Sequence, residues 1–294
     1  MRALLVTFAA CLSGAILWAE GHDVVIPYIP PPKSSTGLRD PVTMLARRLQ
    51  GGQATLTFAE KNGLLSSVLR ELKLPLSSQV LVFSKTSLQH EDITPRTPRA
   101  IYFNDNIYLG FTPGGDRLEL SAVDPDIGAV FYTLSQRASA RPSLVTDATC
   151  LQCHAVPATL GIAGHVLRSV FVRSDGRLAS EARSYLTDHR SPIEERWGGW
   201  FVSGALAGDT HMGNALLRAG QTDTAFDRAP GTRLTDVASL FYSDLYPSPH
   251  SDVVALMVLA HQVRMHNLIA RVHYDANPTA PRSLEGPDVR RPRL

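Results

Sequence analysis

Three residues near the middle of the chain combine thiol and imidazole chemistry at short spacing. Cys150, Cys153 and His154 form the pattern C-x-x-C-H within TCLQCHAV, residues 149–156. Two thiols this close are compatible with a disulfide, half of a zinc site, a redox dithiol or a covalent anchor for haem. In the last alternative, a helical C-x-x-C spaces the two sulfurs to match the haem vinyl groups. The histidine that follows is then held within reach of the iron.

The N-terminus changes the cysteine count. Residues 1–19 contain one arginine, an apolar run and small residues up to Ala19, which predicts a cleaved signal peptide and an exported, periplasmic or otherwise secreted protein. A retained membrane anchor and a lipoprotein acceptor at Cys11 are the alternatives. Cleavage removes Cys11 and leaves Cys150 and Cys153 as the only thiols, so the mature chain is not a disulfide-stapled scaffold.

The surroundings of the motif favour haem over its rivals. A structural zinc site needs four ligands, and the chain has no second cysteine pair. A thioredoxin-like dithiol follows a buried strand of a βαβ unit, whereas residues 141–149 are not a clear buried strand. Covalent haem also explains why no other thiol remains to compete for the attachment reaction.

Through Cys150, Leu151, Gln152, Cys153 and His154 the chain resembles the c-type cytochromes. The resemblance implies one covalently bound haem c, attached outside the cytoplasmic membrane, with His154 as the proximal iron ligand. It also implies exported redox proteins as partners. A compact cytochrome c carries its motif near the start of a small all-helical domain. Here residues 20–149 precede the motif, so the chain looks more like the large single-haem cytochrome c domain proteins of bacteria.

The elements around the motif predict an α+β fold rather than a small all-α cytochrome c. Period-two patterns with turn residues between them indicate an antiparallel, hairpin-rich sheet, and apolar residues at helical spacing indicate several helices around the haem-binding segment. The expected strands are 79–84, 99–104, 106–112, 117–123 and 128–134, with a further hairpin over 165–180 turning at 174–176. The expected helices are 41–50, 62–74 and 251–274, the last capped by Ser251 or Asp252.

These elements suggest one haem-binding domain over residues 41–276, with a division into 41–140 and 141–276 as an alternative. Residues 20–40 form a Pro-rich extended segment, and residues 277–294 are expected to be a disordered tail. A formal net charge of +2 gives no reason to expect nucleic acid as a partner. The apolar run 253–260 is too short for a membrane span, so no integral span is expected after signal cleavage.

The iron also needs a sixth ligand or an open position. Met212 and His211 lie in a glycine-containing segment some sixty residues after the motif, where the resemblance places a methionine ligand. His261 is expected on the most apolar stripe of the long helix, together with Val254, Met257 and Val258. The alternatives are that Met212 packs in the core and that a buried His261 is only hydrogen-bonded.

Aromatic and basic residues supply further candidates for the haem pocket. Trp197 and Trp200 flank Gly198-Gly199, where a flat porphyrin could approach the backbone closely, although a structural turn in the core explains the pattern equally well. Arginines are good partners for haem propionates, or else ordinary surface residues. The candidates are Arg168, Arg190 and Arg196.

Two functions from different classes follow. One is electron transfer through a single six-coordinate haem between exported partners. The other is an oxidoreductase with an open or displaceable distal site, acting on peroxide, a sulfur compound or a small organic substrate. The size of the chain favours the enzyme, since a carrier needs no such domain, while the lack of a second C-x-x-C-H weakens two-haem mechanisms. A haem that serves as a structural staple or gas sensor is a third alternative.

Overall fold

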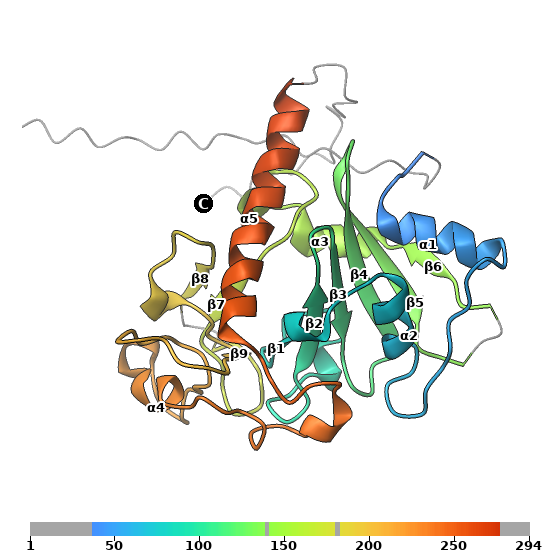
Figure 1. The fold of residues 1–294 in the computed structure, drawn as a ribbon. Helices are drawn as coiled ribbons and strands as arrows, with labels where there is room; N and C mark the ends of the chain where they lie inside the picture. Colours follow the sequence, from blue (N-terminus) through green and yellow to red (C-terminus); the bar gives the residue numbers. More distant parts are fainter. Residues whose placement is uncertain (1–36, 139–140, 180–182, 277–294) are drawn as a thin grey trace, which may run out of the picture.

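A computed structural model describes residues 37–138, 141–179 and 183–276, shown as the coloured ribbon in Figure 1. The expected signal peptide, most of the Pro-rich segment and the expected C-terminal tail lie outside these residues. The expected α+β fold is confirmed within them: an antiparallel sheet is combined with a few helices.

Seven strands form one antiparallel sheet in the order β6-β5-β4-β3-β2-β1-β9, and two more form a separate ribbon. The seven are β1 (Val80–Val82), β2 (Arg99–Phe103), β3 (Ile107–Phe111), β4 (Arg117–Asp124), β5 (Gly128–Ser135), β6 (Leu144–Thr146) and β9 (Trp200–Phe201). The ribbon pairs β7 (Arg168–Val170) with β8 (Ser184–Leu186). All five strands expected between 79 and 134 are present. The edge strands β6 and β9 are too short to carry a clear period-two pattern, and sequence reasoning missed them.

The helices are α1 (Pro41–Gln50), α2 (Leu65–Glu71), α3 (Leu151–His154), α4 (Ala229–Thr232) and α5 (Val253–Ala276). The expected bounds of α1 are confirmed, and Asp40 Oδ1 caps it by accepting from the amides of Val42 and Thr43. Helix α2 is shorter than the expected 62–74. The cap of α5 is Asp252, whose Oδ1 accepts from the Ala255 amide at 2.9 Å.

Alternation along the strands divides the core into two layers. Leu81 and Phe83 face one side of β1 and pack with residues of α1 and α2, whereas Val80 and Val82 face the other side and pack with residues of α5. Figure 1 shows the same arrangement, with α1 and α5 on opposite sides of the sheet. The side that faces α5 also carries the C-x-x-C-H segment, so this layer positions the candidate site.

Helix α5 is apolar on more than one side, and the expected orientation of His261 is wrong. The stripe of Val254, Met257 and Val258 that was expected to be buried is 40–62% exposed, and His261 is exposed with it. The neighbouring stripe of Leu256, Leu259, Ala260 and Val263 packs against the sheet instead. Both stripes carry apolar residues at helical spacing, so the sequence pattern does not distinguish them. Packing against the sheet decides which stripe is buried.

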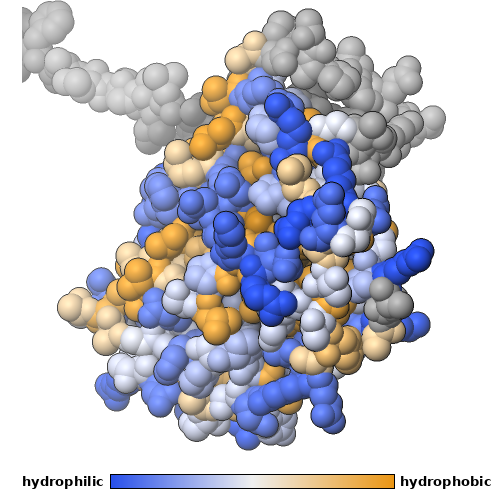
Figure 2. Space-filling view, turned by 45° about the vertical axis from the view of Figure 1, so that its right-hand side comes forward, coloured by the Kyte–Doolittle hydropathy of each residue, from blue (hydrophilic) through white to orange (hydrophobic). Residues whose placement is uncertain are grey.

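By length and composition α5 is the one helix in the described ranges that could cross a membrane. Of its most apolar window, 39% is buried inside the protein, and a core helix of a soluble protein passes the same test. Hydrophilic and hydrophobic residues are interspersed on the face shown in Figure 2, with the hydrophobic ones in scattered patches.

The expected hairpin over 165–180 is only partly correct. The turn at 174–176 is present, closed by Arg173 donating to the carbonyl of Arg177, and Val172 forms an isolated bridge to Leu178. The strand β7 nevertheless pairs with β8 rather than with residues 177–180. Hydrophobic alternation does not predict which of two segments pairs with β7, because either pairing would bury the same face of the strand.

Candidate functional site

The C-x-x-C-H segment follows the edge strand β6 and is helical. A 3-10 turn over Ala148–Cys150 runs into α3, and Asp147 caps the turn by accepting from the Thr149 amide at 2.9 Å. Cys150 is partly buried and packs against Ala129, Phe131 and Ala163, whereas Cys153 is exposed. The helical conformation assumed for the motif in the sequence analysis is therefore present.

The imidazole of His154 is fixed in one tautomer. Its Nδ1 lies 3.0 Å from the carbonyl oxygen of Gly164, and a carbonyl can only accept, so Nδ1 carries the proton. The Gly164 amide donates in return to the His154 carbonyl at 2.8 Å. The ring packs on Phe131 of β5, with centroids 4.7 Å apart. Nε2 is left with a free lone pair, the usual state of a histidine that binds a metal through Nε2.

Burial lowers the pKa of His154 below its ordinary value, so the imidazole is neutral at neutral pH. Burial, with Asp147 and Glu119 adding to it, raises the pKa of the Cys150 thiol to about 12. Because of the first effect, His154 can act as a neutral nitrogen donor without releasing a proton. The second keeps Cys150 protonated until a reaction partner is held against it.

Helix α5 holds the segment that contains Gly164. The side-chain amide of Asn267 accepts from the His165 backbone amide at 2.9 Å and donates to the His165 carbonyl at 2.7 Å. A Cβ on Gly164 would lie 2.4 Å from Asn267 Oδ1, so this close approach requires glycine. Arg271, one turn further along α5, donates to the Leu160 carbonyl. The long helix therefore sets the position of the carbonyl that orients His154.

A cavity of about 460 Å³ opens beside Cys150, Cys153 and His154. Its floor is the side of the sheet that faces α5. Residues paired across neighbouring strands form rows on this floor. One row contains Ile101, Gly110 and Glu119, and the next contains Tyr108, Ser121 and Phe131. Apolar walls are formed by Leu167, which directly precedes β7, and by Leu259 and Val263 of α5. Cavities of this size and character are typical of small-molecule and cofactor sites.

Basic residues lie in the same cavity. Arg99 forms an ion pair with Glu119 on the floor, and Gly110 permits this because a Cβ there would collide with the Arg99 guanidinium. Arg99 Nε is buried and has no hydrogen-bond partner. Lys85 lines the cavity as well, with 14% of its side chain exposed. Arg99 and Lys85 therefore give the cavity two cationic groups, each in an ion pair with a glutamate.

A polar cluster lies at the α5 side of the cavity. His165 is within hydrogen-bond distance of Ser121, Nε2 to Oγ, at 2.6 Å, and its ring lies 4.3 Å from that of Tyr108. The Tyr108 hydroxyl pairs with His266 Nδ1 at 2.9 Å. Burial lowers the pKa of both histidines, so the cluster is uncharged at neutral pH.

The expected distal ligands lie elsewhere. Met212 is fully buried in a separate core cluster with Phe171 and Phe226, and its Sδ accepts from Ser169 Oγ at 3.5 Å. His211 is buried against Trp197, accepts from the Gly213 amide and has its pKa lowered by burial to about 4. Neither residue lines the cavity beside His154.

His261 is exposed and lies 4.9 Å from the His189 ring, also away from the cavity. Trp197 and Trp200 lie in the core rather than on the cavity wall. Trp200 is one layer behind that wall, since it packs in the same cluster as Leu167 and Leu259. Gly198 and Gly199 lie in a tightly packed turn of the core. A Cβ on Gly198 would lie 2.5 Å from the Val170 carbonyl oxygen, so this packing requires glycine there.

Of the arginines expected near propionates, Arg168, Arg190 and Arg196 do not line this cavity. Arg196 instead donates to the carbonyls of His189 and Ser191. Arg99, Lys85 and Glu119 were missed by sequence reasoning. A signal did exist for Arg99 and Glu119, because each is a charged residue that alternates with buried residues of its strand.

Within the described ranges, no group of three or more His, Cys, Asp or Glu side chains is gathered as a protein-only metal site requires. Comparisons with protein-family models, with curated proteins and with solved structures give no match for the chain.

Proposed function

We propose that this chain is an exported c-type haem protein that transfers electrons through one haem attached to Cys150 and Cys153. The observation that carries the proposal is the orientation of His154. Its Nδ1–H is committed to the Gly164 carbonyl, and the imidazole stands at the rim of a largely apolar cavity together with both thiols. A haem c requires these three groups in one place.

The cavity supports the proposal through its shape and its charges. A haem has a flat apolar body and two carboxylates, and the sheet face lines the cavity with Ile101, Tyr108 and Phe131. Arg99 and Lys85 line the cavity, and their guanidinium and ammonium groups are the cationic groups that could pair with the propionates. These residues hold and orient the group, which when bound supplies one-electron redox chemistry.

Electron transfer needs one edge of the macrocycle to be near solvent, so that a partner can approach it. Cys153 is exposed and Cys150 is only partly buried, so a haem edge attached to these two thiols would lie at the protein surface. The interspersed surface and the small net charge fit transient contacts with other exported redox proteins rather than binding to nucleic acid.

A second candidate function is an oxidoreductase with an open distal site. It is favoured by the placement of Met212, His211 and His261, none of which lines the cavity. Among the described residues that do line it, none is a methionine. The histidine and lysine side chains that line the cavity besides His154 are His90, His165 and Lys85, and they are the candidates for a distal ligand.

The test of haem attachment uses the full chain expressed in a host that matures c-type haem proteins. Wild type is expected to retain haem after denaturing electrophoresis and to gain the mass of one haem. A Cys150→Ala, Cys153→Ala double variant is expected to lose both signals, whereas Cys11→Ala is the matched control and is expected to keep them. Wild type without covalent haem under these conditions would contradict the proposal.

The two candidate functions are separated by the ferrous spectrum of the same protein. A low-spin spectrum in both redox states that carbon monoxide does not change is expected for the electron carrier. A high-spin ferrous form that binds carbon monoxide readily is expected for the open-site enzyme and would exclude the simple carrier.

A further inference from the structure

Helix α5 carries a second apolar stripe on the side that faces away from the sheet. The residues of this outer stripe follow one another at alternating steps of four and three positions: Val254, Val258, His261, Met265, Leu268 and Val272. The inner stripe, with Leu256, Ala260 and Val263, lies on the opposite side of the helix and packs on the sheet. In Figure 1, α5 lies in front of the sheet, and no other helix or strand of the described residues is drawn over it.

The outer stripe is accessible along its length. Its most exposed aliphatic side chains, with Ile269 at its border included, are 47–65% exposed: Val254, Val258, Ile269 and Val272. His261 in the middle is exposed as well. Scattered apolar side chains are normal on a protein surface, whereas a continuous apolar stripe marks an interaction site.

The spacing of the outer stripe indicates that its partner is another helix. Steps of four and three repeat every seven residues, and this repeat keeps a narrow seam in contact with a second helix that winds around the first. A straight helix repeats every 3.6 residues, so contact with an irregular protein surface does not require a strict seven-residue repeat.

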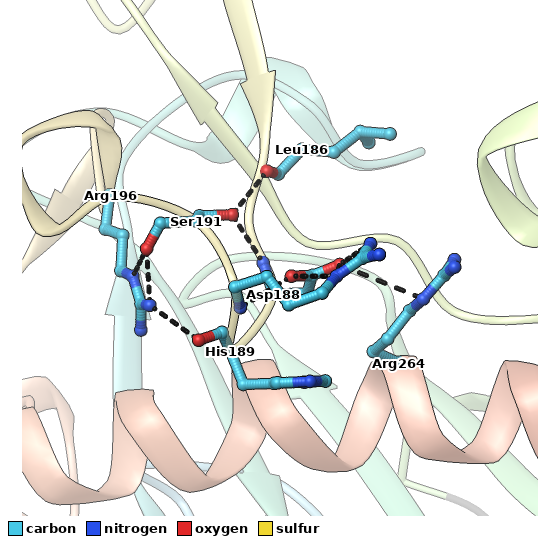
Figure 3. A network of polar contacts seen from close by, with 7 residues as sticks. Leu186, Asp188, His189, Ser191, Arg196 and Arg264 are labelled. Atoms are coloured by element: carbon cyan, nitrogen blue, oxygen red, sulfur yellow. Dashed lines mark hydrogen bonds and ion pairs between the residues drawn. The ribbon is translucent and has the colours of Figure 1, made fainter.

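The charges of α5 argue against a lipid surface as the partner. An interfacial helix is rich in lysines and arginines that contact anionic headgroups. Helix α5 contains no lysine and two arginines, and both arginines are paired within the protein. Arg264 Nε lies 3.8 Å from Asp188 Oδ2, and Arg271 pairs with Asp275 at 2.8 Å. Figure 3 shows Arg264 turned toward Asp188, within the network that fixes the segment after β8.

A second copy of α5 complements the outer stripe. When two such helices lie antiparallel about a two-fold axis at the middle of the stripe, each contact occurs twice. The facing pairs are then Val254 with Val272, Val258 with Leu268, and His261 with Met265. No two charged side chains face each other along this seam, and the opposed helix dipoles favour the arrangement. A parallel pair would instead place the His261 side chains of the two copies against each other.

We infer that the protein forms a two-fold dimer through the outer stripe of α5, with the two helices antiparallel. Each copy contributes one helix, so the interface is smaller than a standard one of about 800 Å² per partner. The dimer is therefore weak, with an expected dissociation constant on the order of 10 µM. The inference does not rest on the haem, because it is the inner side of α5, with Leu259 and Val263, that lines the cavity beside His154.

The test is sedimentation-velocity centrifugation of the full chain, purified from the host used for haem attachment, at about 1 to about 100 µM. Wild type is expected to change from monomer to dimer over this range. Val258→Glu places an unpaired carboxylate in the seam and is expected to weaken dimerisation at least about tenfold. The matched control is Val145→Glu, the same substitution at a valine of β6 that is 52% exposed, and it is expected to dimerise like wild type.

The orientation is tested with two variants that carry a single cysteine, Val254→Cys and Val272→Cys. Each is made in a chain in which Cys11, Cys150 and Cys153 are replaced by alanine. Under mild oxidation the mixture of the two is expected to form a disulfide-linked dimer, whereas each variant alone is not. This chain carries no thioether haem and is expected to dimerise like wild type, so failure of haem attachment and failure of dimerisation are separate results.

Circular dichroism establishes that each variant is folded. Wild type that stays monomeric at every concentration, or a folded Val258→Glu variant that dimerises like wild type, would overturn the inference. Disulfide formation by each single-cysteine variant alone would overturn the antiparallel arrangement. Cosedimentation of monomeric wild type with vesicles of phosphatidylcholine and phosphatidylglycerol would show that the stripe binds lipid instead.

Discussion

At the scale of single residues, the two cysteines of the motif differ although they are only three positions apart. Cys150 packs against the sheet and its pKa is raised to about 12, first by burial and then by Asp147 and Glu119. Cys153 is exposed at the surface. Since the thiolate is the reactive species, the two thiols should react at different rates.

We expect iodoacetamide to label Cys153 at least about tenfold faster than Cys150 at pH 7.5 in protein made without haem attachment. Timed quenching followed by peptide mass spectrometry measures both rates in one sample. The control is the same protein in concentrated urea, where the two rates should converge. Equal rates in the folded protein would show that Cys150 is not shielded by the sheet.

His154 shows how a residue's chemistry depends on a neighbour distant in the chain. Its tautomer is set by Gly164, ten positions later, and Gly164 is kept in place by Asn267 of α5. The motif alone names His154 as a ligand candidate. Which ring nitrogen is free follows only from the contact with Gly164.

At the scale of elements, α5 links the sheet to the segment that follows the motif. Its inner stripe packs on the sheet, Asn267 binds both backbone groups of His165, and Tyr274 donates to the Ile127 carbonyl. This helix therefore contributes to the position of the candidate site as well as to the core.

Asn267→Leu should reduce the free energy of unfolding by about 2–4 kcal/mol, because the buried amide and carbonyl of His165 lose their partners. Urea denaturation followed by circular dichroism measures the change. Val272→Ala, at a position of the same helix that is 65% exposed, is the matched control and should stay within about 0.5 kcal/mol of wild type. If the two variants have the same stability, Asn267 does not hold this segment.

At the scale of the whole molecule, several histidines are buried in the neutral state. Burial lowers the pKa of His154, His165 and His266, and lowers that of His211 to about 4. Below their unfolded pKa of about 6.5, the unfolded chain binds protons that the folded chain does not. Stability is therefore full above about pH 6.5 and declines as the pH falls through that value toward 4.

We expect His211→Asn to reduce the loss of folding stability between pH 6.5 and 4. The asparagine oxygen can accept from the Gly213 amide as His211 does, but it does not titrate. Urea midpoints at a series of pH values provide the measurement. His250→Asn, which changes an exposed histidine, should leave the decline as in wild type. An unchanged slope in His211→Asn would mean that His211 does not contribute to acid sensitivity.

Two adjoining cavities are the other feature of the whole molecule. One, of about 460 Å³, is lined by the thiols and His154, the other, of about 290 Å³, is lined by the segment after β8 and by α5, and His165 lines both. The residues involved come from β2 to β5, from the segments around β7 and β8, and from α5. No local stretch of sequence contains enough of them to reveal either cavity.

The sequence by itself determined the local features of this protein. Alternation in 79–134 predicted the five central strands, and apolar spacing with a cap at Ser251 or Asp252 predicted α5. The haem interpretation of C-x-x-C-H assumed the helical turn that ends at His154. Such features depend on neighbours a few positions apart. The tertiary structure decided the remainder: which stripe of α5 is buried, that β7 pairs with β8, that Met212 packs in the core, and that Arg99 and Glu119 lie beside the motif. Those outcomes depend on which distant surfaces meet, and several pairings satisfy the same hydrophobic pattern until the sheet and α5 come together.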